Sequence, residues 1–250
     1  MGNGPKLTNT PDAPDQPKAQ SMPNLSNAPS PPKSWEEVLS AQRLLQATFP
    51  DCVLVGGSAS ALHTKHRVSF DGDHVLSDLK DRYDKILHDL EHQAGWVTKR
   101  KTPPVQILGH FHGVEIGIRQ LIRKRPLETL VVDRITIPTL AEMARIKGWL
   151  IVRRNTTRDF LDFVALCDKL QAEADGILPA IRELDSYYPQ DAGESVLRQL
   201  CRQLSEPNPW DRDRIDLRMY KALKAPYADW SYIETRSKEI ALLLMKDLLR

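Results

Sequence analysis

Residues 53–73 read VLVGGSASALHTKHRVSFDGD and decide the fold. The stretch begins with a short apolar run that ends in Gly56, Gly57 and Ser58, as a buried strand does when it turns sharply into a helix. Two glycines let the backbone approach an anion, and the N–H groups at the start of the following helix, expected over 58–66, then point at phosphate. Gly-Gly turns after strands are common, so this feature alone also fits an ordinary turn.

The end of the same stretch places two carboxylates on a second expected strand, over 68–75. Side chains two residues apart on a strand point to the same face, so Asp71 and Asp73 would lie side by side. Without a cation they would repel, and one would take up a proton. Oxygen ligands at this spacing suit Mg²⁺ or Mn²⁺ that carries a nucleoside triphosphate. An exposed Asp-Gly-Asp turn is the alternative, and Gly72 keeps that alternative open.

Around this stretch the chain divides into three parts. Residues 1–33 are rich in Pro, Asn, Ser, Asp and Gln and predict a disordered tail. Residues 34–172 alternate helical and strand patterns, and residues 173–250 read as helices interrupted by prolines. We therefore expect an α+β fold in which a mixed sheet is flanked by helices and followed by a helical C-terminal region.

Local patterns give approximate bounds for the elements. Capping boxes at Ser34 with Glu37 and at Thr139 with Glu142 mark the starts of two helices. The other expected elements are strands at 52–55, 96–101, 105–108 and 114–118, one or two strands within 130–137, and helices at 78–93, 139–153 and 157–170.

Composition excludes several classes of protein. A net charge of +2 over 250 residues gives no global basic field of the kind that coats nucleic acid. The apolar run at 240–245 is too short to span a bilayer, and the N-terminus lacks the apolar segment of a secretory signal. Three scattered cysteines predict buried free thiols in a cytoplasmic protein, not a disulfide framework or a zinc site.

Gly-Gly-Ser, a short helix and then Asp-x-Asp on the next strand together resemble the core pattern of the nucleotidyltransferase superfamily. The particular branch that the sequence resembles is that of the AbiEii-type nucleotidyltransferase toxins. A later segment supports this, since 140–149 (LAEMARIKGW) looks like that family's lysine-bearing helix and 158–162 (RDFLD) like its Arg-Asp-x-x-Asp helix. The resemblance covers about 53–169 and implies a nucleotidyltransferase-like sheet.

The resemblance implies three groups of site residues. Nucleotide binding would fall to Gly56, Gly57, Ser58, Lys147, Arg154 and Arg158. Metal binding and catalysis would fall to Asp71, Asp73 and Glu115, with Asp159 and Asp162 in support.

Each of these assignments has a structural alternative. Glu115 is an acid inside an alternating apolar run, where a charged residue usually has a functional or structural cause. An edge-strand Glu that faces water would also fit the pattern. Lys147 could be a solvated helix residue, and Arg158 with Asp162 could form an ordinary i,i+4 ion pair. The family has apolar residues after each aspartate where this chain has Gly72 and His74, and His74 should face the opposite side of the strand.

The predicted reaction is in-line attack by a hydroxyl on the α-phosphorus of a nucleoside triphosphate. The acceptor would be an RNA, such as tRNA, or a protein, and the resemblance implies an antitoxin as a partner. Basic clusters at 119–125 and 212–224 would suit an RNA backbone or would simply be solvated. Two other functions stay open: a non-catalytic module that binds nucleotide or a partner, and a metal-dependent hydrolase. No histidine metal site is expected, although His110 and His112 would suit the active cleft.

Overall fold

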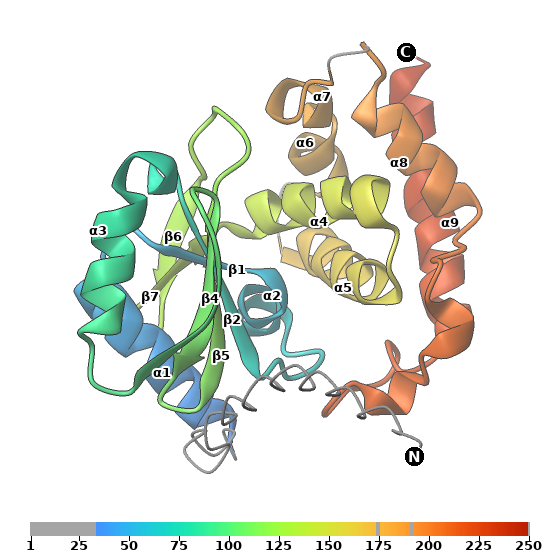
Figure 1. Cartoon of the computed structure of the whole chain (residues 1–250). Helices are drawn as coiled ribbons and strands as arrows, with labels where there is room; N and C mark the ends of the chain where they lie inside the picture. Colours follow the sequence, from blue (N-terminus) through green and yellow to red (C-terminus); the bar gives the residue numbers. More distant parts are fainter. Residues whose placement is uncertain (1–33, 174–175, 191–192, 250) are drawn as a thin grey trace, which may run out of the picture.

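The computed structural model describes residues 34–173, 176–190 and 193–249, and the expected disordered tail at 1–33 lies outside them. Within this part the chain forms a five-stranded mixed sheet, with helices on both of its faces and a further set of helices towards the C-terminus (Figure 1). This is the α+β architecture that the sequence predicts.

One pair of neighbouring strands near the centre of the sheet runs parallel. Its strand order is β1-β2-β5-β4-β3, in which β2 and β5 run parallel and the other neighbours are antiparallel. The strands are β1 (Val53–Val55), β2 (Asp71–Leu76), β3 (Trp96–Thr102), β4 (Gln106–Phe111) and β5 (Val114–Gln120), and a separate hairpin comprises β6 (Thr129–Val132) and β7 (Ile135–Pro138). The parallel pair aligns Asp71 with Glu115 and Asp73 with Gly117.

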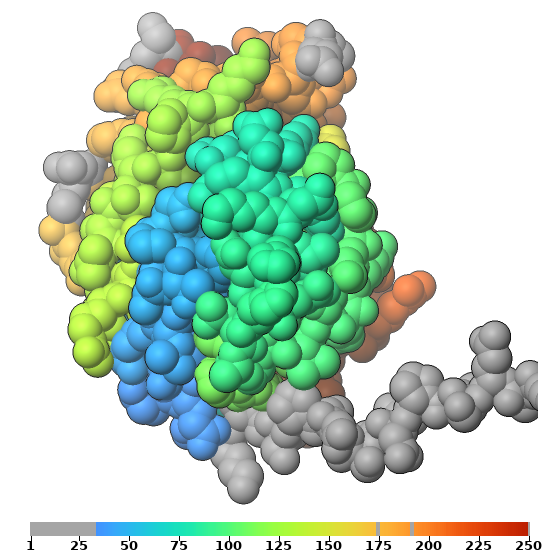
Figure 2. Space-filling model, turned by 60° about the vertical axis from the view of Figure 1, so that its left-hand side comes forward, coloured from blue at the N-terminus to red at the C-terminus, as the bar shows by residue number. Residues whose placement is uncertain are grey.

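Two helices cover one face of the sheet. These are α1 (Trp35–Thr48) and α3 (Leu79–Glu91), which lie side by side on the outside of the molecule in Figure 2. The apolar stripe of α3, including Ile86, packs against strand residues such as Ile116, and all of them are buried. This face is therefore closed to any ligand, and the opposite face must carry the site.

The remaining helices form a second core on the other side of the sheet (Figure 1). They are α2 (Gly56–Thr64), α4 (Leu140–Arg154), α5 (Thr157–Glu173), α6 (Ile177–Ile181), α7 (Leu184–Tyr187), α8 (Val196–Ser205) and α9 (Trp230–Leu248). Between α8 and α9 the chain makes two 3-10 turns, Arg212–Arg214 and Leu217–Met219. The prediction of a helical C-terminal region is confirmed except in this connecting segment.

The strand expected over 68–75 starts later than predicted, at Asp71. The preceding residues pair with the C-terminal segment instead. The backbone N–H of Val68 donates to the carbonyl of Lys221, and that of Lys224 donates to the carbonyl of His66, both at 2.9 Å. The C-terminal segment thus joins the chain immediately before the two aspartates, which local sequence patterns could not show.

One of the two expected capping boxes forms completely. Ser34 exchanges both reciprocal hydrogen bonds with its third helical residue. At α4 the hydroxyl of Thr139 accepts from the N–H of Glu142, but the Glu142 carboxylate does not return the bond. It is buried between Arg123, at 2.7 Å, and Arg145, at 3.1 Å, because an ion pair inside the protein outcompetes a cap.

Two predictions from composition can be compared with the structure. The three cysteines are buried and free, and burial raises the pKa of Cys201 to about 11. In the part of the chain that the structure covers, no helix combines the length and the apolar character needed to cross a bilayer.

Candidate functional site

The two aspartates of β2 lie on the sheet face that α1 and α3 leave uncovered. Asp71 and Asp73 are partly exposed, whereas Gly72 and His74 alternate with them and are buried on the other face. The expected side-by-side arrangement is therefore present. His74 faces away from the site, as predicted, and burial lowers its pKa to about 3, so the ring is neutral at physiological pH.

Two glycines enclose the side chain of Asp73. A methyl group added to Gly56, whose φ is +71°, would lie 2.9 Å from Asp73 Oδ2, and one added to Gly117 of β5 would lie 3.1 Å from Asp73 Oδ1. A residue with a β-carbon would crowd the carboxylate at either position. The Gly-Gly turn and the aspartate pair, separate in the sequence, thus meet at one point.

Serine hydroxyls hold Asp71 from two sides. Ser58 is buried, and its hydroxyl donates to the backbone carbonyl of Asp71. Ser69 Oγ donates to Asp71 Oδ1. The contact of Ser58 fixes the turn to β2, and its part in phosphate binding stays a prediction.

Each aspartate also faces an arginine. Arg158 NH1 lies 3.8 Å from Asp71 Oδ2, and Arg119 Nε lies 3.4 Å from Asp73 Oδ1. The i,i+4 pair considered for Arg158 does not form, because its guanidinium turns to β2. Arg119 was visible in the sequence only as part of a basic cluster, and its place beside Asp73 follows from the β2–β5 register.

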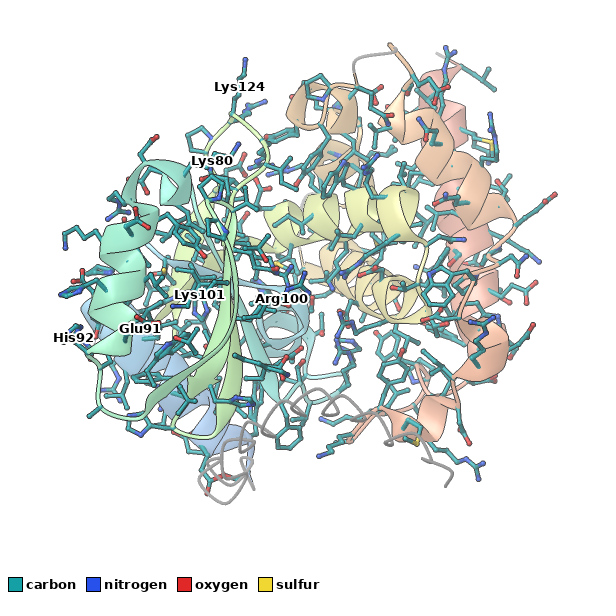
Figure 3. The ribbon with its side chains drawn as sticks, viewed as in Figure 1. Lys80, Glu91, His92, Arg100, Lys101 and Lys124 are labelled. Atoms are coloured by element: carbon teal, nitrogen blue, oxygen red, sulfur yellow. The ribbon has the colours of Figure 1, made fainter. Side chains whose placement is uncertain are left out.

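Glu115 lies on the same face of the sheet as the aspartates and opposite Asp71. Its carboxylate is half exposed and takes an ion pair from Lys99 at 2.8 Å. Figure 3 shows how this face continues to the sheet edge: Arg100 of β3 projects towards α2, and its neighbour Lys101 projects towards α3. The face that carries the aspartates is therefore also lined with cations.

The two aspartates can be tested as a metal site. Within 34–173, 176–190 and 193–249, no three side chains of His, Cys, Asp or Glu gather closely enough to hold a metal ion by themselves. Mg²⁺ in nucleotide sites commonly uses one or two carboxylates and completes its shell with water and phosphate oxygens. Asp71 and Asp73 fit this pattern, in which the ion arrives with a triphosphate.

A buried ionic cluster lies behind the site. Lys147 is completely buried, and its ammonium lies 2.7 Å from Asp162 and 3.3 Å from Asp159. Asp159 also accepts from Arg154 Nε at 2.6 Å and from Thr156. Lys147 is therefore not a solvated residue, and it could contact a nucleotide only by leaving both carboxylates. These contacts favour a role in positioning the helices α4 and α5.

Asp162 is the centre of this cluster. Arg67 Nε donates to it at 2.7 Å, and His66 Nε2 lies 2.9 Å from it. Burial alone would raise the pKa of Asp162, but the charges of Arg67 and Lys147 and the hydrogen bond from His66 outweigh it and hold the pKa well below its ordinary value. Asp162 is thus a permanent anion that three basic side chains share.

Arg67 connects this cluster with the Gly56-Gly57 turn. A methyl group added to Gly57 would lie 2.6 Å from Arg67 NH2, and the guanidinium carbon of Arg67 lies 5.9 Å from the ring centroid of Tyr220. One buried side chain therefore touches the turn, the Asp162 cluster and the C-terminal segment. Nothing in the local spacing around Arg67 indicated this role.

A pocket of about 230 Å³ opens next to Arg158. It is lined by Arg154, Thr156, Arg158, Asp211, Ile215 and Tyr220. Arg154 ends α4, Thr156 lies between α4 and α5, and Arg158 lies in the first turn of α5. The last three belong to the C-terminal segment, which therefore forms the other wall of the pocket. Arg154 and Arg158 are each more than a third exposed, so both can reach an anion in the pocket.

Residues of the two basic clusters and one histidine of α2 form structural contacts away from the aspartates. In the first basic cluster Arg123 pairs with the buried Glu142, and in the second Arg212 lies over Trp230. His63 bonds to the carbonyl of Pro138 at 2.8 Å. These positions provide no continuous basic track.

Comparisons with known proteins place the fold. No model of a known protein family matches the chain. JHP933 of Helicobacter pylori superposes with a TM-score of 0.54 at 14% identity, covering 88% of this chain and 95% of that one. A second H. pylori protein, provisionally described as a nucleotidyltransferase, gives a TM-score of 0.51 at 16% identity, with 85% and 96% covered. The chain therefore has a nucleotidyltransferase-like fold.

Sequence similarity points to a different set of proteins. The chain is 35% identical over 132 residues to the mycolic acid-containing lipids exporter MmpL11 of Mycolicibacterium smegmatis. It is 31% identical over 136 residues to the heme uptake protein MmpL11 of Mycobacterium tuberculosis. Each match covers 50% of this chain but only 13% of the transporter. Half of the chain thus corresponds to a small part of these relatives, and their named activities belong to the whole transporters.

Proposed function

We propose that this protein is a metal-dependent nucleotidyltransferase that transfers a nucleoside monophosphate from a triphosphate to a hydroxyl group of an RNA or a protein. The observation that carries the proposal is the meeting of the Gly56-Gly57 turn with Asp71 and Asp73 on an open sheet face. The nucleotidyltransferase-like fold supports it. The resemblance to AbiEii-type toxins extends the proposal to RNA such as tRNA as the acceptor and to an antitoxin as a partner.

In the proposed reaction the acceptor oxygen attacks the α-phosphorus, and the bond from that phosphorus to the bridging oxygen breaks. Pyrophosphate would leave, and the proton of the hydroxyl would pass to a carboxylate, either Glu115 or one of the two aspartates. Mg²⁺ or Mn²⁺ held by Asp71 and Asp73 would stabilise the charge that develops on the phosphates.

The protein's own groups would bind and orient the triphosphate. Backbone N–H groups of the turn at the start of α2 would point at phosphate oxygens. Arg158 would exchange its present carboxylate partner, Asp71, for the pyrophosphate, since guanidinium binds both anions in the same bidentate way. Arg154, which stays bonded to Asp159, would add positive charge beside it. Lys147 would act indirectly, by fixing Asp159 and with it Arg154. Tyr220 would offer a ring to the nucleobase.

The alternative function is a non-catalytic module that binds a nucleotide or a partner. The ion pairs of Asp71 with Arg158 and of Asp73 with Arg119 favour it, since these arginines already neutralise the carboxylates. Similarity to short parts of transporters also fits a module joined to other activities.

The test uses each α-labelled nucleoside triphosphate with Mg²⁺ and total cellular RNA. Wild-type protein is compared with Asp71→Ala/Asp73→Ala and with a control that removes two exposed carboxylates of α3, Asp81→Ala/Asp84→Ala. We expect label in RNA or in the protein for the wild type and the control alone. Binding of Mg·nucleotide without transfer would support the module, and equal transfer by the aspartate variant would refute the site.

A further inference from the structure

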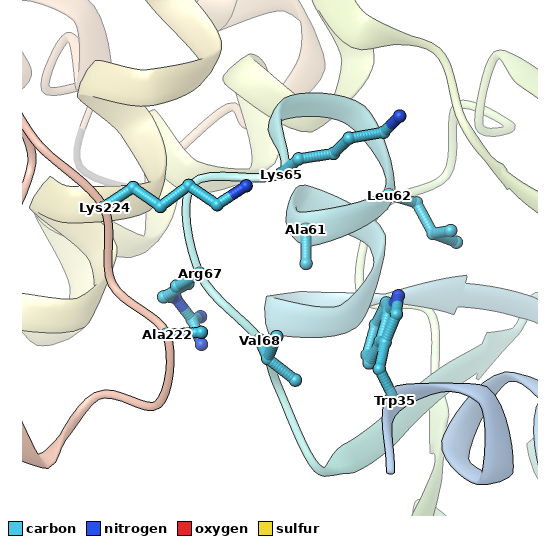
Figure 4. A pocket seen from close by; sticks show the side chains of 8 residues that line it. All are labelled: Trp35, Ala61, Leu62, Lys65, Arg67, Val68, Ala222 and Lys224. Carbon is cyan, nitrogen blue, oxygen red and sulfur yellow. The ribbon is translucent and has the colours of Figure 1, made fainter.

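A separate pocket lies at the C-terminal half of α2, next to the first residue of α1. Its volume is about 280 Å³, and its lining consists of Trp35, Ala61, Leu62, Lys65, Arg67, Val68, Ala222 and Lys224 (Figure 4). One wall is the contact between 66–68 and the C-terminal segment, which two backbone hydrogen bonds hold together. The pocket is therefore built from three distant parts of the chain and is not a gap in one loop.

The walls of this pocket suit a flat apolar group. Trp35 supplies an aromatic face, and Leu62 and Val68 supply aliphatic surface. Pockets for small molecules usually measure about 300–1,000 Å³, so this one would take a small ligand of one or two fused rings. An indole face stabilises such a ring by stacking as well as by removing it from water.

The charge of the pocket is entirely positive. Lys65 and Lys224 are exposed, and neither forms a salt bridge within the described part of the chain. Figure 4 shows Lys224 reaching from the C-terminal segment towards the end of α2, from which the side chain of Lys65 extends in the direction away from Lys224. Arg67 adds a third cation, nearly buried, whose Nε and NH2 bond to Asp162. Among the described residues that line the pocket there is no carboxylate, so the complementary ligand carries negative charge.

We propose that this pocket binds a small aromatic molecule that carries a phosphate group. The ring would lie against Trp35, and the phosphate, with a charge of about −1.5 to −2 at neutral pH, would lie between Lys65 and Lys224. Two unpaired ammonium groups together carry two positive charges. The charge of a phosphate balances them more closely than the single negative charge of a carboxylate does. The site is distinct from the proposed nucleotide pocket, which opens beside Arg158.

The pocket is connected to the Gly56-Gly57 turn through Arg67. The Arg67 side chain lines the pocket and its guanidinium lies beside Gly57, so a ligand that shifts this side chain alters the turn. Binding at the two places is then coupled, and by linkage each ligand changes the affinity of the other by the same factor. This coupling rests on the proposed function, whereas the binding of the aromatic phosphate does not.

Pyridoxal 5′-phosphate is a suitable probe of the binding site. Its aldehyde condenses with a lysine amine and releases water, and borohydride then reduces the imine to a stable secondary amine that peptide mass spectrometry locates. We expect saturable labelling of Lys65 or Lys224, at least tenfold weaker with pyridoxal, which lacks the phosphate. Labelling that is uniform over exposed lysines such as Lys80 and Lys246, without saturation, would overturn the proposal.

Variants make the test specific. Lys65→Gln/Lys224→Gln should abolish the saturable quenching of tryptophan fluorescence by the probe, and Trp35→Phe should remove most of its amplitude. The matched control Lys80→Gln/Lys246→Gln should retain both the saturable quenching and its full amplitude. Unchanged quenching in the first variant, with its circular dichroism spectrum intact, would refute the site.

The coupling has its own readout. The probe is titrated again in the presence of Mg²⁺ and a non-hydrolysable triphosphate analogue, and we expect its Kd to change by about fivefold or more. An unchanged Kd at a saturating analogue concentration would refute the coupling. If the analogue does not bind at all, the proposed function fails while the probe site stands on its own titration.

Discussion

Replacing Lys147 with methionine tests whether this lysine positions helices or binds nucleotide. Its ammonium has no exposed surface and lies 2.7 Å from Asp162 and 3.3 Å from Asp159, which are equally buried. Removing one partner of a buried ion pair typically costs about 3–5 kcal/mol, because the remaining charge stays in a poorly solvated place. Arg67 and Arg154 still face the two carboxylates, so we expect the lower end of that range.

The assay is urea denaturation, with a thermal scan alongside. A loss of about 3 kcal/mol in the free energy of unfolding corresponds to a decrease in Tm of roughly 6–12 °C for a chain of this size. The matched control is Lys85→Met on α3. Lys85 is 72% exposed and pairs with Asp89 at i,i+4, and such pairs contribute about 0.5 kcal/mol or less.

One combination of results would refute the positioning role of Lys147. The free energy of unfolding of Lys147→Met could lie within about 1 kcal/mol of the wild-type value while Mg·nucleotide binding weakens tenfold. The lysine would then bind the triphosphate directly. In that case the ammonium must leave Asp159 and Asp162 when the nucleotide enters. The opposite result, a large loss of stability and near-normal nucleotide affinity at low temperature, supports the positioning role.

Three further changes test other parts of the site. Gly57→Ala should destabilise the protein by about 1–3 kcal/mol in urea denaturation, although alanine favours helices, because its methyl group would lie 2.6 Å from Arg67. His74 should contribute a loss of stability of about 1.4 kcal/mol per pH unit as pH falls below 6.5, because burial lowers its pKa to about 3 and the unfolded chain binds the proton first; His74→Leu should reduce the slope between pH 6 and 4 by about that amount. Arg119→Gln should tighten Mn²⁺ binding without nucleotide by up to about fivefold in electron paramagnetic resonance titrations, since Arg119 competes for Asp73.

Local patterns predicted the elements well because their causes are local. The helix that becomes α3 shows its buried stripe in the sequence, and the strands that become β4 and β5 show alternating or continuous apolar residues. The turn at Gly56 and the shared face of Asp71 and Asp73 also follow from neighbouring residues. The residue periodicity of a strand or a helix was enough to predict these features.

The contacts that complete the site are long-range, and no local pattern specifies them. Arg67 and Asp162 are 95 residues apart in the sequence, and Arg119 reaches Asp73 only because β5 lies next to β2. Tyr220 lies outside the region of resemblance altogether. The predicted strand start at 68 was wrong for the same reason, since a segment more than 150 residues later takes those hydrogen bonds.

Two pairs of nearby aspartates lie in or behind the candidate site, and burial distinguishes them. Asp159 and Asp162 are fully buried on α5 and are neutralised by Lys147, Arg67 and Arg154, so a metal ion could reach them only by displacing these cations. Asp71 and Asp73 are partly exposed, and their arginine partners lie at 3.4 Å or more. Exposed pairs at such distances contribute little and exchange readily, whereas buried pairs are costly to break. Asp159 and Asp162 therefore hold the fold in place, and Asp71 and Asp73 are the pair that we propose to exchange their arginines for a metal ion.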